Sequence, residues 1–212
     1  MIEEAATGIL PARQARSRQT RDRLMAAGMH LIETRGIDDI AVADIAAQAK
    51  CSVGAFYNRF RDKESFFTAA VEQVLDEERI RARTALSPEN WPDHTAECPA
   101  AIVDFAVELV RRRQGLIRAI LKRSMSEHVA PDPIGEAGQA VVQAALHLLQ
   151  ERPPTDLADP PGEVAVRAGM QIVLGTLFSA IVTGRGAMAI DDDGLQDWLT
   201  YLFHQALARP RP

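Results

Sequence analysis

Hydrophobic residues recur every three to four positions along most of the chain, the spacing that places side chains on one face of an α-helix. This spacing predicts long helices over residues 17–34, 63–86, 100–113, 114–128, 133–151, 163–183 and 192–207. No segment shows the apolar–polar alternation of a half-buried strand. The pattern therefore predicts an all-α protein.

Two shorter helices are predicted within the stretch from Ala41 to Phe67. Apolar residues at i, i+3, i+4 and i+7 from Val42 onward give the first helix one buried face over barely two turns. The second begins at Ser52, whose hydroxyl can cap the N–H groups of the following turn, and runs to Phe60. Two short helices that meet steeply across a four-residue turn form a helix-turn-helix, whose second helix enters the major groove of DNA.

This stretch resembles the N-terminal pattern of the TetR family of bacterial transcriptional regulators. The matching positions keep one register over about 25 residues: Val42, Ile45, Ala46, Ala49, Ser52, Gly54, Tyr57, Phe60 and Lys63. The resemblance implies an N-terminal three-helix DNA-binding domain that contains the helix-turn-helix, followed by a C-terminal helical domain for ligand binding and dimerisation.

Four departures from the family pattern bear on the turn or on the expected DNA contacts. Ala41 stands where the family usually has a Thr that caps the first motif helix and touches phosphate. Lys50 replaces the glycine of the turn, so we expect either a positive φ angle there, at a cost of about 1 kcal/mol, or a different turn. Ala55 replaces a Thr or Ser that can touch DNA. Arg59 replaces a common aromatic residue and adds positive charge to the expected DNA face.

The resemblance implies DNA contacts for Val42, Ser52, Val53, Gly54, Ala55, Tyr57, Asn58, Arg59 and Lys63. Within this set, Tyr57 and Lys63 are expected to hold the protein against phosphates. Val53, Ala55 and Asn58 are expected to face base edges, where an asparagine can read adenine with two hydrogen bonds.

The chain is expected to comprise a flexible N-terminal arm, a DNA-binding domain and a larger helical domain, over residues 1–16, 17–67 and 68–212. Arginines at 13, 16 and 18 lie at the end of the arm and just after it. Two interpretations of the arm remain open. It is either a solvated tail or a basic arm that reaches the minor groove or the flanking phosphates.

Charge is unevenly distributed along the chain, whose net charge is −5. From Pro11 to Lys63, ten Lys or Arg accompany six Asp or Glu, a net of +4, whereas residues 64–212 carry a net of −7. A basic segment on an acidic body is expected when one end of a protein meets phosphate and the other does not.

The resembled family binds its ligand inside the helices of each subunit. Candidate wall residues in this chain are large and apolar or aromatic: Trp91, Phe105, Leu109, Leu121, Met125, Met170, Leu174 and Phe178. The same residues fit a hydrophobic core equally well. If they line a pocket, their character favours an apolar or aromatic small molecule.

The last two predicted helices are expected to pair with those of a second subunit, as in the resembled family. Candidate interface residues are Ala168, Ile172, Gly175, Leu195, Trp198, Leu199 and Leu202. The stretch from Ala168 to Gly184 has no charge, but it is shorter than the roughly 20 residues that a bilayer needs. A buried helix is therefore expected, without membrane insertion.

Individual residues within the helices predict further contacts. Gly28, inside the first helix, predicts a close approach to another helix, since glycine costs about 1 kcal/mol there against alanine. Asp62 is a candidate cap for the helix that follows it. Three arginines at 111–113 either complement the negative end of a helix dipole or form a phosphate site.

No catalytic or metal-binding pattern stands out. The five histidines are scattered, and the two cysteines have neither metal-ligand spacing nor a disulfide framework. We therefore expect no enzyme activity, no metal and no cofactor. The N-terminus lacks an export signal, so a cytoplasmic protein is expected.

Two functional hypotheses follow. The first is a homodimeric, sequence-specific transcriptional regulator, a repressor that a small-molecule effector releases from a near-palindromic double-stranded DNA operator. The second is a helical small-molecule-binding or interaction protein with a degenerate helix-turn-helix. It is motivated by the departures at Ala41, Lys50 and Ala55.

Overall fold

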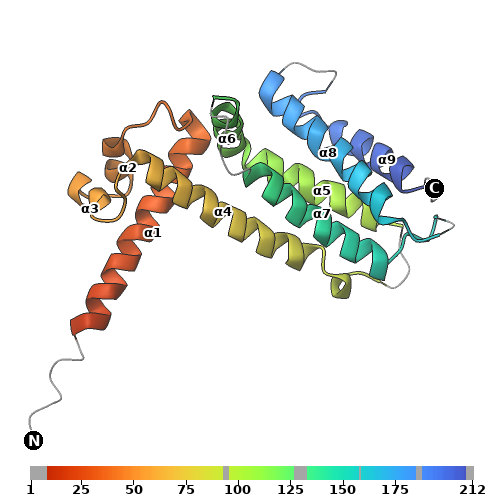
Figure 1. Ribbon diagram of the computed structural model, residues 1–212, viewed down its shortest axis with the longest axis horizontal. Coiled ribbons are helices and arrows are strands. Elements are labelled where there is room, and N and C mark those ends of the chain that lie inside the picture. The colour runs from red at the N-terminus through yellow and green to blue at the C-terminus, as the bar shows by residue number, and fades with distance from the viewer. Residues whose placement is uncertain (1–8, 93–95, 127–132, 158, 185–187, 209–212) are drawn as a thin grey trace, which may run out of the picture. The chain divides into compact units, whose positions relative to one another are not determined.

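The computed structural model describes residues 9–92, 96–126, 133–157, 159–184 and 188–208, with only the backbone for 9–14, 125–126 and 133–134. In these residues it is helical, without strands: α1 (Ile9–Arg35), α2 (Val42–Gln48), α3 (Val53–Tyr57), α4 (Lys63–Ala85), the 3₁₀ turn η1 (Pro88–Asn90), α5 (Cys98–Arg112), α6 (Gln114–Ser126), α7 (Pro133–Glu151), α8 (Glu163–Thr183) and α9 (Leu195–Leu207) (Figure 1). The predicted all-α fold is confirmed.

Helix boundaries agree with the periodicity except at a few ends. Helix α1 already begins at Ile9, so residues 9–16 are helical where a flexible arm was expected, and residues 1–8 lie outside the described part. Alanine and arginine, which favour helices, fill much of this extension. Helix α9 begins at Leu195, later than predicted. The carboxylate of Asp192 instead accepts the N–H of Ala189 at 2.6 Å, within the preceding loop.

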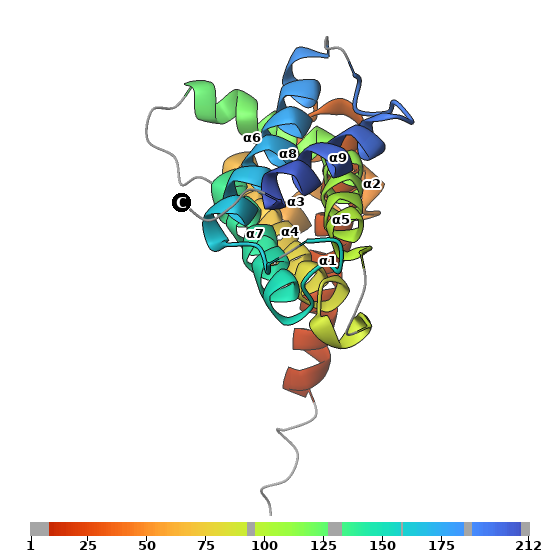
Figure 2. The same cartoon turned by 90° about the vertical axis from the view of Figure 1, so that its right-hand side faces the viewer.

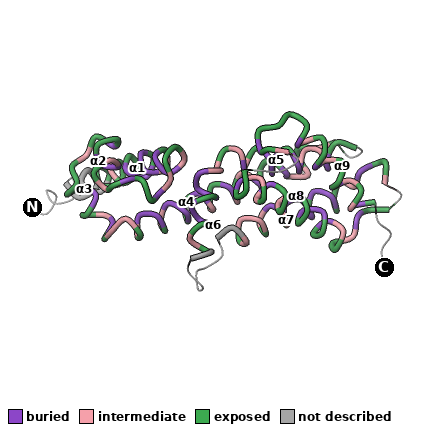
Figure 3. Tube along the Cα trace, turned by 90° about the horizontal axis from the view of Figure 1, so that it is seen from above, coloured by how far each residue is buried: buried purple, intermediate pink, exposed green. Residues whose placement is uncertain are grey.

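The chain divides into two compact units between Glu72 and Gln73, inside α4. The first unit contains α1, α2, α3 and the start of α4 around a core of fully buried Leu24, Ile32, Ile45, Phe56 and Phe66. Figure 3 marks the buried stretches along the Cα trace of these helices in purple.

Gly28 explains how closely helices approach inside this core. A Cβ atom at Gly28 would lie 2.1 Å from the Cζ atom of Phe66, far inside contact distance. The glycine therefore makes room for the Phe66 ring, and the predicted close approach is confirmed.

The second unit is a helical bundle in which α8 and α9 run side by side, with α5 packed against both (Figures 1 and 2). A Cβ atom at Gly169 of α8 would lie 2.6 Å from the ring of Phe203, so the small residue lets α9 approach. By length and composition, α8 could cross a membrane. Its stripe of Val166, Met170 and Val173 is instead buried in this core.

A buried carboxylate joins α4 to α5 within the second unit. Glu78 is 4% exposed, and its two oxygens accept hydrogen bonds from Arg81, Arg112 and Arg113 at 2.6–3.0 Å. A second carboxylate, that of Glu77, binds Arg113 at 3.1 Å. Two of the three consecutive arginines therefore bind protein carboxylates.

The first arginine of the run, Arg111, donates to the backbone carbonyls of Ile190 and Asp192, at 2.8 and 3.2 Å. All three arginines are thus held by groups of the second unit, at the end of α5.

Candidate nucleic-acid interface

The helix-turn-helix is formed by α2, α3 and the turn between them. Helix α2 ends at Gln48 with Ala49 as its C-terminal cap, and the N–H of Cys51 then bonds to the carbonyl of Ala46 at 2.9 Å. Lys50, between these residues, has a φ angle of 52°. This is the left-handed conformation that glycine adopts without penalty. Of the two alternatives expected at Lys50, a positive φ angle or a different turn, the structure shows the positive φ.

The N-terminus of α2 is only half capped. Ala41 occupies the cap position but has no side-chain acceptor for the free N–H groups of the first turn. The carboxylate of Asp44 does accept the N–H of Ala41, at 2.8 Å. This is one of the two reciprocal bonds of a capping box. The alanine therefore removes the other bond from the motif.

Helix α3 is capped as predicted but is shorter than predicted. The hydroxyl oxygen of Ser52 accepts the N–H of Ala55 at 3.1 Å, which confirms the cap. The helix ends at Tyr57 and not at Phe60, with Asn58 as its C-terminal cap. A helix this short depends on its neighbours for its orientation.

Aromatic packing anchors the inner side of α3. Phe56 is fully buried, and its ring centroid lies 5.3 Å from that of Phe60 and 5.6 Å from that of Phe66. The opposite side of α3 is open. Val53 is 42% and Tyr57 54% exposed.

The remaining motif residues differ in how accessible they are. Ser52, Gly54 and Asn58 are exposed, whereas Val42 and Ala55 are half-buried. Most side chains expected to meet DNA therefore share the solvent-facing side of α3 and its flanks.

Lys63 has partners inside the domain. Its Nζ atom donates to the backbone carbonyls of Ile37 and Ile40, at 3.0 and 3.1 Å. An ammonium group carries three N–H donors, and these bonds use two. Lys63 thus tethers the loop between α1 and α2 to the start of α4, and its expected phosphate contact stays a prediction.

Asp62 caps α4, as predicted. Its Oδ1 atom accepts the N–H of Ser65 at 2.7 Å, and the Ser65 hydroxyl accepts the N–H of Asp62 at 3.1 Å. The backbone hydrogen bond from Ser65 is the main cause that lowers the pKa of Asp62 from 3.8 to about 2, with further help from Arg61. The cap is therefore ionised at neutral pH.

Arg59 links α3 to α1. Its Nη1 atom donates to the carbonyl of Ala55 at 2.8 Å, and its Nε atom donates to the carbonyl of Ser17 at 3.3 Å. Its Nη2 atom lies 3.5 Å from the Ser17 hydroxyl. From the sequence, Arg59 is expected as a DNA contact that adds positive charge, and nothing in the sequence points to Ser17, because 42 positions separate the two residues.

A polar recess adjoins this link, with a volume of about 530 Å³. Its walls are Arg16, Ser17 and Thr20 from α1, together with Asn58 and Arg59, which directly follow α3. The first described turns of α1 are also strongly basic, with exposed arginines at 16, 18, 21 and 23. Phosphate oxygens would find hydrogen-bond donors of positive charge along this surface.

The second unit places the expected ligand residues in or against one core. Phe105 and Met170 are buried, while Trp91, Leu109, Leu121, Leu174 and Phe178 are half-buried against the same core. The side chain of Met125 lies outside the described part. The arrangement brings these residues together, and their role in ligand binding stays a prediction.

The expected interface residues divide into two sets. Leu195 and Leu199 are almost fully buried within the unit. The others are exposed on the open side of α8 and α9: Ala168, Ile172, Gly175, Trp198 and Leu202.

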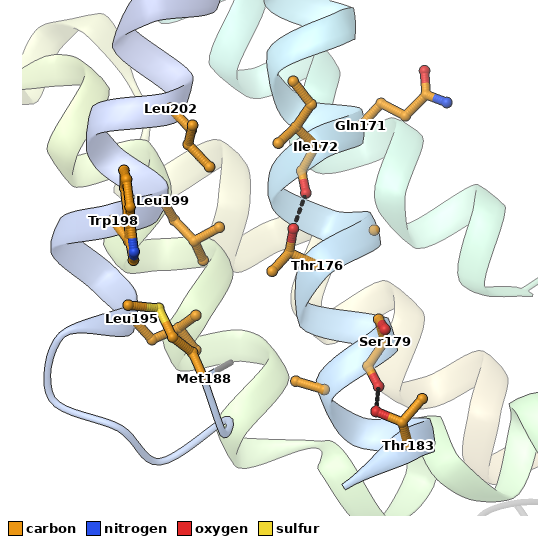
Figure 4. Close-up of a pocket in the computed structure, with 12 residues that line it drawn as sticks. Gln171, Ile172, Thr176, Ser179, Thr183, Met188, Leu195, Trp198, Leu199 and Leu202 are labelled. Atoms are coloured by element: carbon orange, nitrogen blue, oxygen red, sulfur yellow. Dashed lines mark hydrogen bonds between the residues drawn. The ribbon is translucent and has the colours of Figure 1, made fainter. Parts of the chain in front are cut away.

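An apolar groove of about 670 Å³ runs between α8 and α9. Figure 4 shows Ile172 on α8 and Leu202 on α9 pointing toward this groove. Tyr201, which the sequence analysis missed, is 54% exposed beside Trp198, with ring centroids 5.6 Å apart.

Residues 24–70 match the family model described as bacterial regulatory proteins, tetR family. The N-terminal domain belongs to the TetR family. The matched residues extend from Leu24 in α1 to Ala70 in α4, and so enclose the helix-turn-helix. The resemblance found in the sequence is thereby confirmed, and α3 occupies the place of the recognition helix of this DNA-binding domain.

Solved structures extend the likeness of fold beyond the TetR domain. A TetR-family transcriptional regulator from Streptomyces coelicolor is 17% identical, with a TM-score of 0.65 over 96% of this chain and 98% of that one. A TetR transcription regulator from Haloarcula marismortui is 16% identical, with a TM-score of 0.64 over 90% and 97%. Salmonella enterica GusR is 16% identical, with a TM-score of 0.59 over 97% and 100%. No curated protein matches the chain.

Proposed function

We propose that this protein is a homodimeric, sequence-specific transcriptional regulator of the TetR type. It acts as a cytoplasmic repressor and leaves a near-palindromic operator when an apolar or aromatic small molecule binds the second unit. The observation that carries the proposal is the exposed outer side of α3, presented by a TetR-family helix-turn-helix whose inner side is anchored in an aromatic core.

The exposed side of α3 suits a major groove. Val53 offers an apolar contact for a thymine methyl group, and Asn58 can bond to adenine. Tyr57 can donate to phosphate, while the arginines of α1 supply positive charge next to the motif. Two such helices in a dimer would read half-sites about 34–36 Å apart.

Dimerisation is supported by the open side of α8 and α9. Trp198, Tyr201 and Leu202 are large, exposed and adjacent to the apolar groove. Such surfaces on soluble proteins mark interaction sites. A second copy that brings the same pair of helices would cover this surface by two-fold symmetry.

The ligand site is proposed among the half-buried residues of the second unit. Trp91, Leu109, Leu121, Leu174 and Phe178 all pack against one core without being fully buried. A ligand that displaces them would bury its own apolar surface. Screening apolar aromatic compounds for release of bound operator would identify the effector class.

Selection of bound sites from a random duplex library, with the full-length protein, tests the DNA-binding proposal. The expected result is a near-palindromic consensus whose half-sites lie about one helical turn apart. Asn58→Ala should then relax the sequence preference. Absence of any enriched sequence would overturn the proposal.

The alternative, a binding protein with a degenerate helix-turn-helix, draws support from the missing cap at Ala41 and the strained Lys50. Both departures cost stability, yet each leaves the two short helices formed and the outer side of α3 exposed. Retained dimerisation without DNA binding at low salt would favour this alternative.

A further inference from the structure

We infer that Arg59 is a positioning residue for sequence readout, which locks the recognition helix to α1 and makes no phosphate contact itself. The inference rests on the proposed function, since it concerns how that function reaches specificity. It also reassigns a residue that charge alone would place among the phosphate contacts.

The recognition helix is too short to hold its own orientation. Helix α3 spans five residues, and Phe56 is its fully buried residue. Phe56, with Phe60 behind it, restrains α3 on its aromatic side. A contact off the aromatic side adds a further restraint on the orientation of this short helix.

Arg59 supplies this contact through the shape of its guanidinium. One edge of the group donates to the Ala55 carbonyl, at the end of α3 where carbonyls lack helical N–H partners. The rest of the group reaches the Ser17 carbonyl and hydroxyl on α1. Guanidinium is planar and presents donors in fixed directions, so one side chain can join both helices.

The residues held by this lock are those proposed to read bases. Two proposed base contacts adjoin Arg59. The carbonyl of Ala55 accepts a hydrogen bond from Arg59, and Asn58 directly precedes Arg59 in the chain. Asn58 shares the polar recess with Arg16 and Thr20 of α1. Fixing α3 against α1 therefore fixes where the Asn58 amide points. A bidentate contact to adenine tolerates little displacement, because both hydrogen bonds must form together.

Two variants separate positioning from charge. Arg59→Lys keeps the positive charge but loses the planar guanidinium with its several N–H donors, and Arg59→Gln loses both the charge and the guanidinium. Affinities of the full-length protein for the selected operator and for a scrambled duplex would be measured by fluorescence anisotropy at several salt concentrations. We expect both variants to lower the operator-to-scrambled ratio about tenfold, with an unchanged salt slope on scrambled DNA.

A phosphate contact gives a different pattern. Arg59→Lys would then keep the ratio, and Arg59→Gln would weaken both duplexes alike and reduce the salt slope by about one. Either result overturns the inference. Arg61→Gln is the matched control, because Arg61 also carries one charge in this segment but is 86% exposed, and its ion pair is with its chain neighbour Asp62. The control should keep the operator-to-scrambled ratio of the wild type.

Amide hydrogen exchange in the absence of DNA tests whether Arg59 holds α3 against α1. In Arg59→Lys, the amides of residues 58–60 should exchange at least about tenfold faster than in the wild type, while those of α5 stay unchanged. Equal exchange at 58–60 would overturn the inference even if DNA binding is altered. If the wild type selects no DNA sequence, the proposed function fails, and the exchange result still reports on the lock.

Discussion

One residue of the DNA-binding unit, Lys50, has a strained backbone conformation that a substitution can relieve. Lys50 has a φ of 52°, and its side chain is exposed at the turn. We expect Lys50→Gly to raise the free energy of unfolding by about 1 kcal/mol, because glycine occupies the left-handed region without a Cβ clash. Urea denaturation would measure the change.

Gln48→Gly is the control for Lys50→Gly, since Gln48 is exposed in α2, where φ is negative. That variant should lose about 1 kcal/mol. If both glycines had the same effect, strain at Lys50 would not be the cause.

Gly28 represents the opposite situation, in which a side chain has no room. Gly28→Ala improves helix propensity by about 1 kcal/mol. Its Cβ atom would, however, lie 2.1 Å from the Cζ atom of Phe66, whose ring also packs on Phe56 and Phe60. We expect a net loss of about 2 kcal/mol from overpacking, measured by thermal unfolding.

Phe66→Leu checks this explanation. In that background, Gly28→Ala should cost much less, because a smaller side chain vacates the contact. An alanine at 28 that is neutral or stabilising in the wild-type background would contradict the packing argument.

In the second unit, one buried carboxylate joins α4 to the end of α5. Glu78 lies between Arg81, Arg112 and Arg113, which are themselves partly exposed. Glu78→Gln would leave three guanidinium groups without their shared counter-charge. We expect the second unit to lose about 3 kcal/mol of stability, by urea denaturation.

Glu108→Gln is the comparison variant for Glu78→Gln. Glu108 also binds Arg81, at 3.0 Å, but its side chain is 62% exposed. Solvent screens such pairs, so the expected loss is below about 0.5 kcal/mol. Equal losses for the two variants would mean that burial of Glu78 does not set the energy of the cluster.

At the scale of the whole molecule, the proposed operator binding requires a dimer in which a second copy covers α8 and α9. Leu202 is 37% exposed at the apolar groove. We expect Leu202→Asp to produce monomers in sedimentation velocity, because each interface would bury two uncompensated carboxylates. Operator affinity should fall at least about tenfold, since a monomer reads one half-site.

Val164→Asp places the same charge on α8 outside the groove, at a residue that is 74% exposed. This variant should stay dimeric and keep operator affinity. Leu202→Asp that remains dimeric would exclude the groove as the interface.

Prediction from the sequence succeeded for features that depend on neighbours in the chain. The 3.6-residue period placed most long helices, because a buried stripe constrains every turn. Ser52 and Asp62 act as caps through bonds that reach only three residues ahead. Lys50 could be read as strained because its place in the motif demands a glycine.

Other features required contacts between distant residues. The pairing of Arg59 with Ser17, and of Lys63 with Ile37 and Ile40, joins positions that are 23–42 residues apart. A charged side chain has the same sequence signature whether it faces solvent or a carbonyl. The early start of α1 was missed because its first turns lack an apolar stripe.

The sequence by itself determined the helical class, the position of the helix-turn-helix and the local caps, since periodicity, turn residues and short-range hydrogen bonds are written in consecutive positions. Only the tertiary structure decided which arginines hold helices together and which face solvent. It also decided which leucines of α8 and α9 are buried and which remain open. The physical reason is that burial and charge pairing depend on what packs against a residue, and that partner comes from elsewhere in the chain.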